Sequence, residues 1–347
     1  MSYWTQRVAA LFGGHPSPAP AAVTPRGVPV HLPDLATHGV PTAALPATAE
    51  AVAGLDPRAA FFEWLAGPGS VLAAPLTLAE QRLLSHLDTL LGSDTAGTEL
   101  LPRAPSVIPQ LMKSLRDEGQ SAHALAQRVE KDANLVAEVI RLASSVHARA
   151  DRPVADLADA IRRLGTEGLR RAIAMVVLKP IFDAPSSSLS GRAAPRLWAH
   201  ADAQAQAGTE LAAASGLDPF EAFVAGLMHN TGWSAALRAV DRAEGGAPAR
   251  FTQAFVLAFD TRRELFFARL VKPWQLNAPL TRLADALLRG EALADAGPLG
   301  QLLAAADRAA TSTLLPHIAS PAPAPIDRAR LAAVPRCTES THPGAAA

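Results

Sequence analysis

Residues 223–232 read Phe-Val-Ala-Gly-Leu-Met-His-Asn-Thr-Gly, and the rest of the chain is interpreted around them. Six small or apolar residues lead up to His229, the amide side chain of Asn230 follows, and Thr231 and Gly232 interrupt the pattern. A buried helix that ends in His and a short polar residue often presents a pair of metal ligands. Because the second residue here is a neutral amide instead of a carboxylate, it can offer a metal an oxygen ligand but no negative charge.

Helical patterns surround this stretch, and no run of alternating polar and apolar residues indicates a strand. Thr77 and Glu80 have the spacing of a capping box, and Gly165 is expected to end one helix of a pair. Helices are expected over 154–164, 166–178, 218–228, 251–259, 261–271, 280–288 and 299–310, and a Ser/Pro-rich loop over 184–195. The sequence therefore predicts an all-α fold, a multi-helix bundle with a Pro/Ala-rich N-terminal extension.

Composition divides the chain into four segments. Residues 1–54 form a Pro/Ala-rich arm or linker in which closely spaced prolines prevent helix propagation. Residues 55–97 form an N-terminal helical extension, with Pro57 placed to begin a helix. Residues 98–312 form the main helical domain, and residues 313–347 form a Pro/Ala-rich tail expected to be mobile.

Charge and cysteine content limit the classes of partner. The chain has 347 residues with 32 basic and 32 acidic side chains, so it lacks the positive charge that nonspecific nucleic-acid binding requires. Its single cysteine, Cys337, permits no intrachain disulfide and fits a reducing cytoplasm. The longest apolar runs, such as 172–178, are too short to span a bilayer. We therefore expect a cytoplasmic protein without nucleic-acid or membrane partners.

The order of short motifs resembles the HDOD family, a bacterial signalling module related to the HD metal-dependent phosphohydrolases. The motifs are Leu101-Pro102-x-x-Pro105, Asp132-Ala133-Asn134-Leu135, Arg141-Leu142-Ala143-Ser144-Ser145, the segment 156–165, Trp198-Ala199-His200 and the block 225–232. Together they span roughly residues 98–290. The resemblance implies an HD-like helical bundle. The chain departs from the pattern at Asn230, where active relatives have Asp, and at Trp233, where they often have Lys.

The resemblance also implies which residues form the centre. An active HD site has a first His, a His-Asp pair and a distal Asp, and the matching positions here are His200, His229, Asn230 and Asp307. We interpret them as a degenerate ligand-binding site with no catalytic residue and no assigned metal ligand. The residue-level alternatives are a hydrogen-bonded core histidine at 200, a helix end closed by His229 and Asn230, and a solvated helix position at Asp307.

Two functions of different classes follow from this interpretation. The favoured hypothesis is a non-catalytic regulatory module of bacterial signal transduction that acts through other signalling proteins or a small ligand such as a nucleotide or cyclic dinucleotide. The alternative is a weak or altered metal-dependent phosphohydrolase acting on a nucleotide or another phosphoester. No cofactor is assigned, although a weakly bound divalent metal is compatible with the resemblance. Phe61, Phe62 and Trp64 are expected either to form a short core helix or to cover the groove near His229.

Overall fold

A computed structural model describes residues 55–93, 100–101, 122–130, 132–146, 153–274 and 276–316. Several expectations from the sequence lie outside these residues. They are the Pro/Ala-rich arm, the Pro102-x-x-Pro105 part of the first family motif, and most of the Pro/Ala-rich tail with Cys337.

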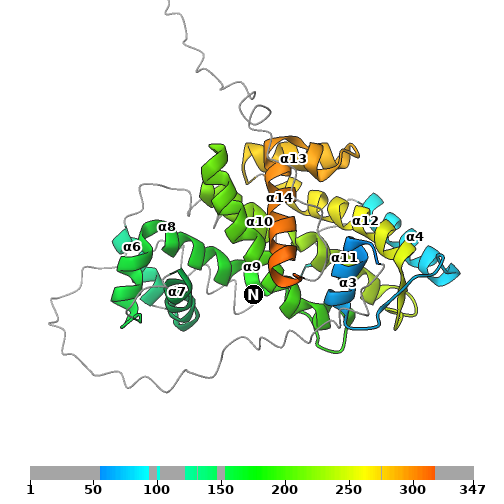
Figure 1. Ribbon diagram of the computed structural model, residues 1–347, viewed down its shortest axis with the longest axis horizontal. Coiled ribbons are helices and arrows are strands. Elements are labelled where there is room, and N and C mark those ends of the chain that lie inside the picture. The colour runs from blue at the N-terminus through cyan, green and yellow to red at the C-terminus, as the bar shows by residue number, and fades with distance from the viewer. Residues whose placement is uncertain are drawn as a thin grey trace, which may run out of the picture.

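The described part of the chain is almost entirely helical, so the predicted all-α fold is confirmed (Figure 1). Its helices are α3 (Pro57–Ala66), α4 (Leu78–Gly92), α6 (Ala122–Glu130), α7 (Ala133–Val146), α8 (Leu157–Leu178), α9 (Leu189–Ser215), α10 (Pro219–His229), α11 (Thr231–Arg242), α12 (Gln253–Val271), α13 (Ala278–Leu288) and α14 (Gly297–Leu314). Short 3₁₀ turns cover Lys179–Ile181, Lys272–Trp274 and Leu293–Asp295. Two strands, β1 (Val71–Leu72) and β2 (Phe251–Thr252), pair in parallel, and the sequence did not predict them.

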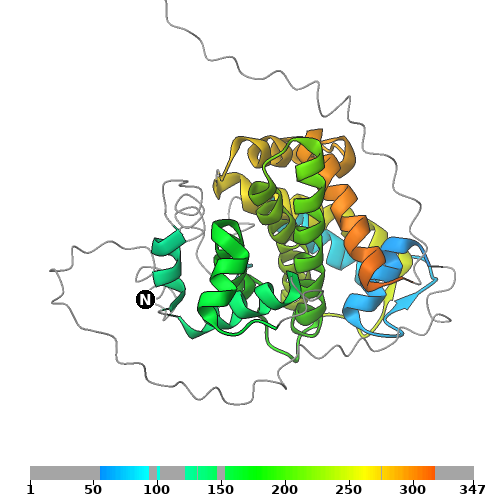
Figure 2. The same cartoon turned by 60° about the vertical axis from the view of Figure 1, so that its left-hand side comes forward.

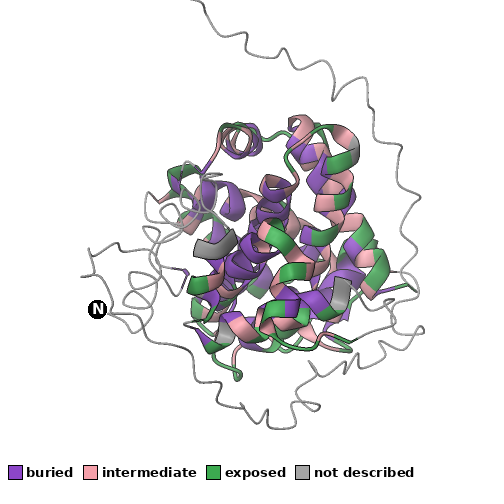
Figure 3. Ribbon diagram, turned by 90° about the vertical axis from the view of Figure 1, so that its left-hand side faces the viewer, coloured by how far each residue is buried: buried purple, intermediate pink, exposed green. Residues whose placement is uncertain are grey.

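Helix α9 is the central element of the bundle. It packs against α10, α11 and α14, and α14 runs alongside α9 and α10 near the middle of the molecule (Figure 1). The buried residues concentrate where these helices face one another (Figure 3). The first residues of α9 correct the predicted loop over 184–195, because the helix begins at Leu189 and continues through Pro195.

The early start of α9 has a local cause. The hydroxyl of Ser188 accepts a hydrogen bond from the backbone N–H of Gly191, which caps the helix. The carboxylate of Asp241, at the end of α11, accepts hydrogen bonds from the backbone N–H groups of Leu189 and Ser190 at 2.8 and 3.0 Å. A negative charge at a helix N-terminus is favourable, and this one comes from a residue 51 or 52 positions away in the chain. The proline content of residues 184–195 alone could not indicate this early start of α9.

Helices α11 and α12 approach each other closely at Gly232. A Cβ atom at this position would overlap with the backbone carbonyl oxygen of Arg263 and would lie 2.9 Å from Cβ of Phe267. Helix α12 is continuous from Gln253 to Val271, so the expected division into helices over 251–259 and 261–271 is wrong. The apolar faces of both halves pack on the same core, and no helix-breaking residue separates them.

The chain turns sharply at Gly165, as the sequence predicts. Gly165 has φ 63° and ψ −168°, a conformation that glycine adopts more easily than other residues. It divides α8 into two parts, and α8 packs with α6 and α7. These three segments lie together at one side of the main bundle (Figures 1 and 2).

The N-terminal segment 55–93 packs tightly on the main bundle. The predicted capping box at Thr77 and Glu80 is present, and Glu80 also accepts hydrogen bonds from the backbone N–H and hydroxyl of Thr252. Glu63 is buried and accepts hydrogen bonds from Ser70 Oγ and the Val71 N–H, which orders the turn before β1. The buried carboxylate of Glu80, bonded to the distant backbone of Thr252, therefore joins this segment to the core.

No helix among residues 55–93, 122–146 and 153–316, where described, has the length and apolar character needed to cross a membrane.

Candidate functional site: a hydrogen-bonded histidine centre

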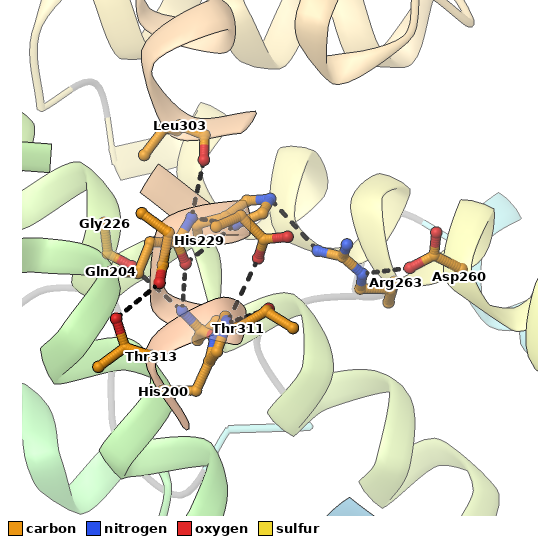
Figure 4. A network of polar contacts seen from close by, with 12 residues as sticks. His200, Gln204, Gly226, His229, Asp260, Arg263, Leu303, Thr311 and Thr313 are labelled. Carbon is orange, nitrogen blue, oxygen red and sulfur yellow. Dashed lines mark hydrogen bonds and ion pairs between the residues drawn. The ribbon is translucent and has the colours of Figure 1, made fainter. Parts of the chain in front are cut away.

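The four site residues predicted from the sequence come from different parts of the bundle and meet near its centre. His200 lies on α9, His229 is the last residue of α10, and Asn230 connects α10 to α11. Asp307 lies on α14, which crosses beside them. His200, His229 and Asn230 are fully buried, whereas the side chain of Asp307 is 30% exposed. Figure 4 shows the centre that the histidines form with their neighbours.

His200 is held by a hydrogen bond at each ring nitrogen. Its Nδ1 lies 3.0 Å from Asn230 Oδ1, and its Nε2 lies 3.2 Å from Thr311 Oγ1 (Figure 4). Since the amide oxygen can only accept, the proton of the neutral ring is on Nδ1, and Nε2 accepts from the Thr311 hydroxyl. The carboxylate of Asp307 is 3.7 Å from Nε2, too far for a hydrogen bond.

Gln204, which the sequence analysis did not identify, connects the two histidines. It lies one turn after His200 on α9, and its Oε1 accepts a hydrogen bond of 2.7 Å from the Asn230 amide. Its Nε2 lies 3.0 Å from His229 Nδ1 and donates at 3.2 Å to the carbonyl oxygen of Leu303 on α14. The Asn230 amide also donates to the Gly226 carbonyl oxygen at 3.3 Å. Gln204 therefore joins α9, α10 and α14 at one buried point.

His229 completes the network on the α12 side. Its Nδ1 accepts from Gln204, so the proton of the neutral ring is on Nε2, which lies 3.0 Å from a carboxylate oxygen of Glu264. Glu264 also forms an ion pair of 2.9 Å with Arg263. The Nε of Arg263 donates at 2.8 Å to Asp260 (Figure 4). The guanidinium of Arg263 stacks over the ring of Trp233, 4.9 Å from its centroid.

The donors and acceptors form one directed chain. Hydrogen bonds run from Thr311 to His200, to Asn230, to Gln204, to His229 and finally to Glu264. All four ring nitrogens of the two histidines have a protein partner in this chain. A fully satisfied polar network in a buried position fixes one arrangement of its members, because any flipped amide or altered tautomer leaves a buried group unpaired.

Burial and neighbouring charges shift two pKa values in the centre. Burial is the main cause that lowers the pKa of His200, and Asn230 and Asp307 oppose it only in part. Burial would raise the pKa of Glu264, but the charge of Arg263 and the hydrogen bond from His229 outweigh it and hold this pKa at about 2. The centre is therefore built around a neutral His200 and an ionised Glu264.

Aromatic rings close the centre on the side of α3. The ring of Phe61 lies 4.6 Å from that of His200 and 5.4 Å from that of Trp233, measured between centroids. Phe62 packs edge-on against Phe251 and Phe259, and both α3 phenylalanines are buried. The expectation of a core helix is therefore confirmed, whereas the ring of Phe61 packs on His200 and not, as expected for the cluster, near His229.

The arrangement does not fit a divalent metal ion. A metal needs imidazole lone pairs and anionic oxygens that converge on one point. In this centre the two available lone pairs point to Thr311 and Gln204, and the amides of Gln204 and Asn230 stand between the rings. Among the residues that the structure describes, no three His, Cys, Asp or Glu side chains are grouped so that they could hold a metal.

The residues missed by the sequence analysis differ in how easily they could have been found. Gln204 is four residues after His200 and Thr311 is four residues after Asp307, so helical spacing places each pair on one face. Arg263 and Glu264 have no local signal, because they reach the centre only through the packing of α12 on α10 and α11.

Comparison with known families decides the relationship of the chain. Residues 101–286 match the model of the HDOD domain, which is more than half of the chain. The chain belongs to the HDOD family. No curated protein sequence is significantly similar to it.

Three solved structures are similar to this chain. An HDOD domain protein of unknown function from Geobacter sulfurreducens is 26% identical, with a TM-score of 0.45 over 66% of this chain and 77% of that one. A protein named "putative metal-dependent phosphohydrolase" from Shewanella amazonensis is 18% identical, with a TM-score of 0.49 over 67% and 83%. A "putative phosphohydrolase" from the same organism is 23% identical, with a TM-score of 0.44 over 67% and 81%.

Proposed function

We propose that this HDOD protein is a non-catalytic regulatory module that acts through contacts with other proteins or with a small ligand. The hydrogen-bonded histidine centre is the observation that carries the proposal. Asn230 stands where a hydrolytic site has its carboxylate, and Gln204 binds both Asn230 and His229. The groups that would hold a metal and its attacking water are instead bonded to one another, so the centre serves to fix the packing of α9, α10, α12 and α14.

One observation favours the alternative of a weak phosphohydrolase. Glu264 lies 3.0 Å from His229, and Asp307 lies 3.7 Å from His200, so two carboxylates stand beside the two histidines. They could replace the charge missing at Asn230 only if Gln204 left its place and Glu264 gave up its ion pair with Arg263. Breaking both sets of buried interactions is costly, which is why the regulatory function is preferred.

Metal content and phosphoester turnover separate the two functions. The full chain is purified in the presence of Mn²⁺, its metal is quantified by mass spectrometry, and hydrolysis of bis(p-nitrophenyl) phosphate is followed with and without chelator. We expect substoichiometric metal and no chelator-sensitive hydrolysis. A stoichiometric ion that is lost in the His229→Ala variant, together with chelator-sensitive turnover, would overturn the proposal.

A double variant tests why the centre does not accept metal. Gln204→Ala with Asn230→Asp removes the bridging amide and restores the carboxylate, so we expect it to bind Mn²⁺ more tightly than the wild-type chain. The matched control is Gln206→Ala, because Gln206 lies on the same helix but is exposed and bonds to Asp202 at the surface. Equal metal affinity in the double variant and the wild-type chain would show that the amide network is not what prevents binding.

A further inference from the structure

A pocket of about 280 Å³ lies beside the histidine centre, between α3, α11, α12 and α14. Pro57, Phe61 and Trp233 form its apolar wall, and Thr311, the hydrogen-bond partner of His200, lies at its edge towards the centre. Its charged residues are Asp56, Arg58, Asp260, Arg263, Asp307 and Arg308. Three arginines and three aspartates therefore face one small space.

Four of these six charges neutralise one another. Asp56 binds Arg58 at 3.1 Å, and Asp260 binds Arg263 at 2.8 Å. Arg58 also lies 4.0 Å from Asp260, which connects the two pairs. A ligand that entered the pocket would not need to supply partners for these groups.

Asp307 and Arg308 remain without a strong partner. No described residue donates a hydrogen bond to Asp307, and the ring nitrogen of His200 at 3.7 Å is already the acceptor for Thr311. The buried Nε of Arg308 has no hydrogen-bond acceptor among the described residues. Successive residues on a helix point in different directions, so these two side chains do not satisfy each other. Buried polar atoms without a partner are rare, and one that lines a pocket is placed to be completed by a bound group.

We propose that this pocket binds a small molecule that carries one anionic and one cationic group, of which the α-amino acids are the simplest class. The anionic group pairs with Arg308 and the cationic group with Asp307. A purely anionic ligand would bring a second negative charge next to Asp307, and a purely cationic ligand would leave Arg308 unsatisfied. The aromatic wall of Phe61 and Trp233 suits a flat apolar body.

The inference deepens the proposed function, because it names the ligand class of a module that binds without turnover. The pocket shares Thr311 with the histidine centre and touches α3, α12 and α14. A ligand seated there contacts the elements that the centre holds together. Occupancy of the pocket can thus change how firmly these helices are packed.

Three probes with the same ring separate the two charges. L-phenylalanine carries both groups, N-acetyl-L-phenylalanine has only the anionic group, and L-phenylalanine amide has only the cationic one. Binding to the full chain is measured by titration calorimetry at constant ionic strength. We expect saturable binding of L-phenylalanine, and about tenfold weaker binding of each of the other two, since a hydrogen bond to a charged group is lost in each case.

Two variants test which residue binds each charged group of the probe. Arg308→Gln removes the cationic partner, so L-phenylalanine should lose its advantage over the amide but keep it over the acetylated probe. Asp307→Asn should give the converse pattern. The control is Arg289→Gln, because Arg289 directly follows α13, pairs with Glu291 and lies outside the pocket; it should leave all three affinities unchanged.

Several results would overturn the inference. These are no saturable binding of L-phenylalanine, equal affinity for the three probes, or unchanged preferences in both variants. Its failure is distinguishable from that of the proposed function. Chelator-sensitive turnover would overturn the function while leaving probe binding intact, whereas an inactive protein that binds no probe would overturn only the ligand assignment.

Discussion

Gln204 shows how a single side chain can change the use of a site. Its amide has both a donor and an acceptor end, so it can bind the donor of Asn230 and the acceptor nitrogen of His229 at the same time. A metal ion would require both histidines to offer lone pairs to one point. The amide instead holds the two rings as different tautomers, with the proton on Nδ1 of His200 and on Nε2 of His229. The residue thus stabilises the centre in a form without a cation.

Replacing Gln204 by Leu should destabilise the protein strongly. The change leaves the Asn230 amide, the Nδ1 atom of His229 and the Leu303 carbonyl without their partner in a buried position. We expect a loss of roughly 3 kcal/mol in the free energy of unfolding, measured by urea denaturation. The control is Gln206→Leu on the exposed face of α9, which should change stability by less than about 1 kcal/mol. Equal effects would contradict the role assigned to the network.

Stability should depend on pH through His200. Burial lowers its pKa in the folded state, so the unfolded state binds the proton more readily. As the pH falls below about 6.5, the unfolded state is therefore favoured, by up to about 1.4 kcal/mol per pH unit. Stability is measured by urea denaturation at pH values from about 7.5 to about 5.5, on either side of the ordinary histidine pKa of about 6.5. The free energy of unfolding should change less steeply with pH in His200→Gln than in the wild-type chain. Equal slopes would show that His200 is protonated equally in both states.

At the scale of elements, close contact between helices explains the second half of the 223–232 stretch. Asn230 ends α10 and precedes α11, so the chain changes direction beside the histidines. Gly232 follows at the point where α11 meets α12, and its missing side chain lets the backbone of Arg263 approach. That approach brings Arg263 and Glu264 to the centre. The glycine that resembled a break in the pattern is therefore a packing residue inside a helix.

Gly232→Ala should loosen the α11–α12 contact. The added methyl group would overlap with the Arg263 carbonyl oxygen, a backbone atom that cannot move aside by itself. We expect the free energy of unfolding to fall by up to about 3 kcal/mol, measured by thermal and urea denaturation. Gly92→Ala is the matched control, because this helical glycine has no atom within 4 Å of the added Cβ and its replacement should be neutral or stabilising. Normal stability of the Gly232 variant would show that the two helices can separate freely.

At the scale of the whole molecule, segment 55–93 is part of the folded body. Phe61 covers His200, Glu80 binds Thr252, and β1 pairs with β2 beyond the middle of the chain. Helices α3 and α4 both contact α12, which carries Arg263 and Glu264. The family match begins at residue 101, so this segment packs on the family domain from outside the matched residues.

Two truncations should therefore differ. A chain that lacks residues 1–50 should keep its helical circular dichroism and its melting temperature, because the Pro/Ala-rich composition of the removed residues does not favour a packed core. A chain that lacks residues 1–93 exposes Trp233, Phe251 and Phe259, and should aggregate or melt much earlier. A large fall in the melting temperature of the shorter truncation, or none in the longer one, would contradict this division.

The sequence by itself determined the helical class, the capping box at Thr77 and the turn at Gly165, because local patterns of three or four residues carry this information. It also identified His200, His229 and Asn230, which belong to the hydrogen-bonded centre. The sequence also identified Asp307, which lies beside the centre but 3.7 Å from His200, too far for a hydrogen bond. Only the tertiary structure decided that Gln204 and Glu264 complete the network, that Asp241 starts α9 early, and that α12 is continuous. Those features depend on contacts between residues far apart in the chain. No local pattern encodes such contacts; the packing of whole helices creates them.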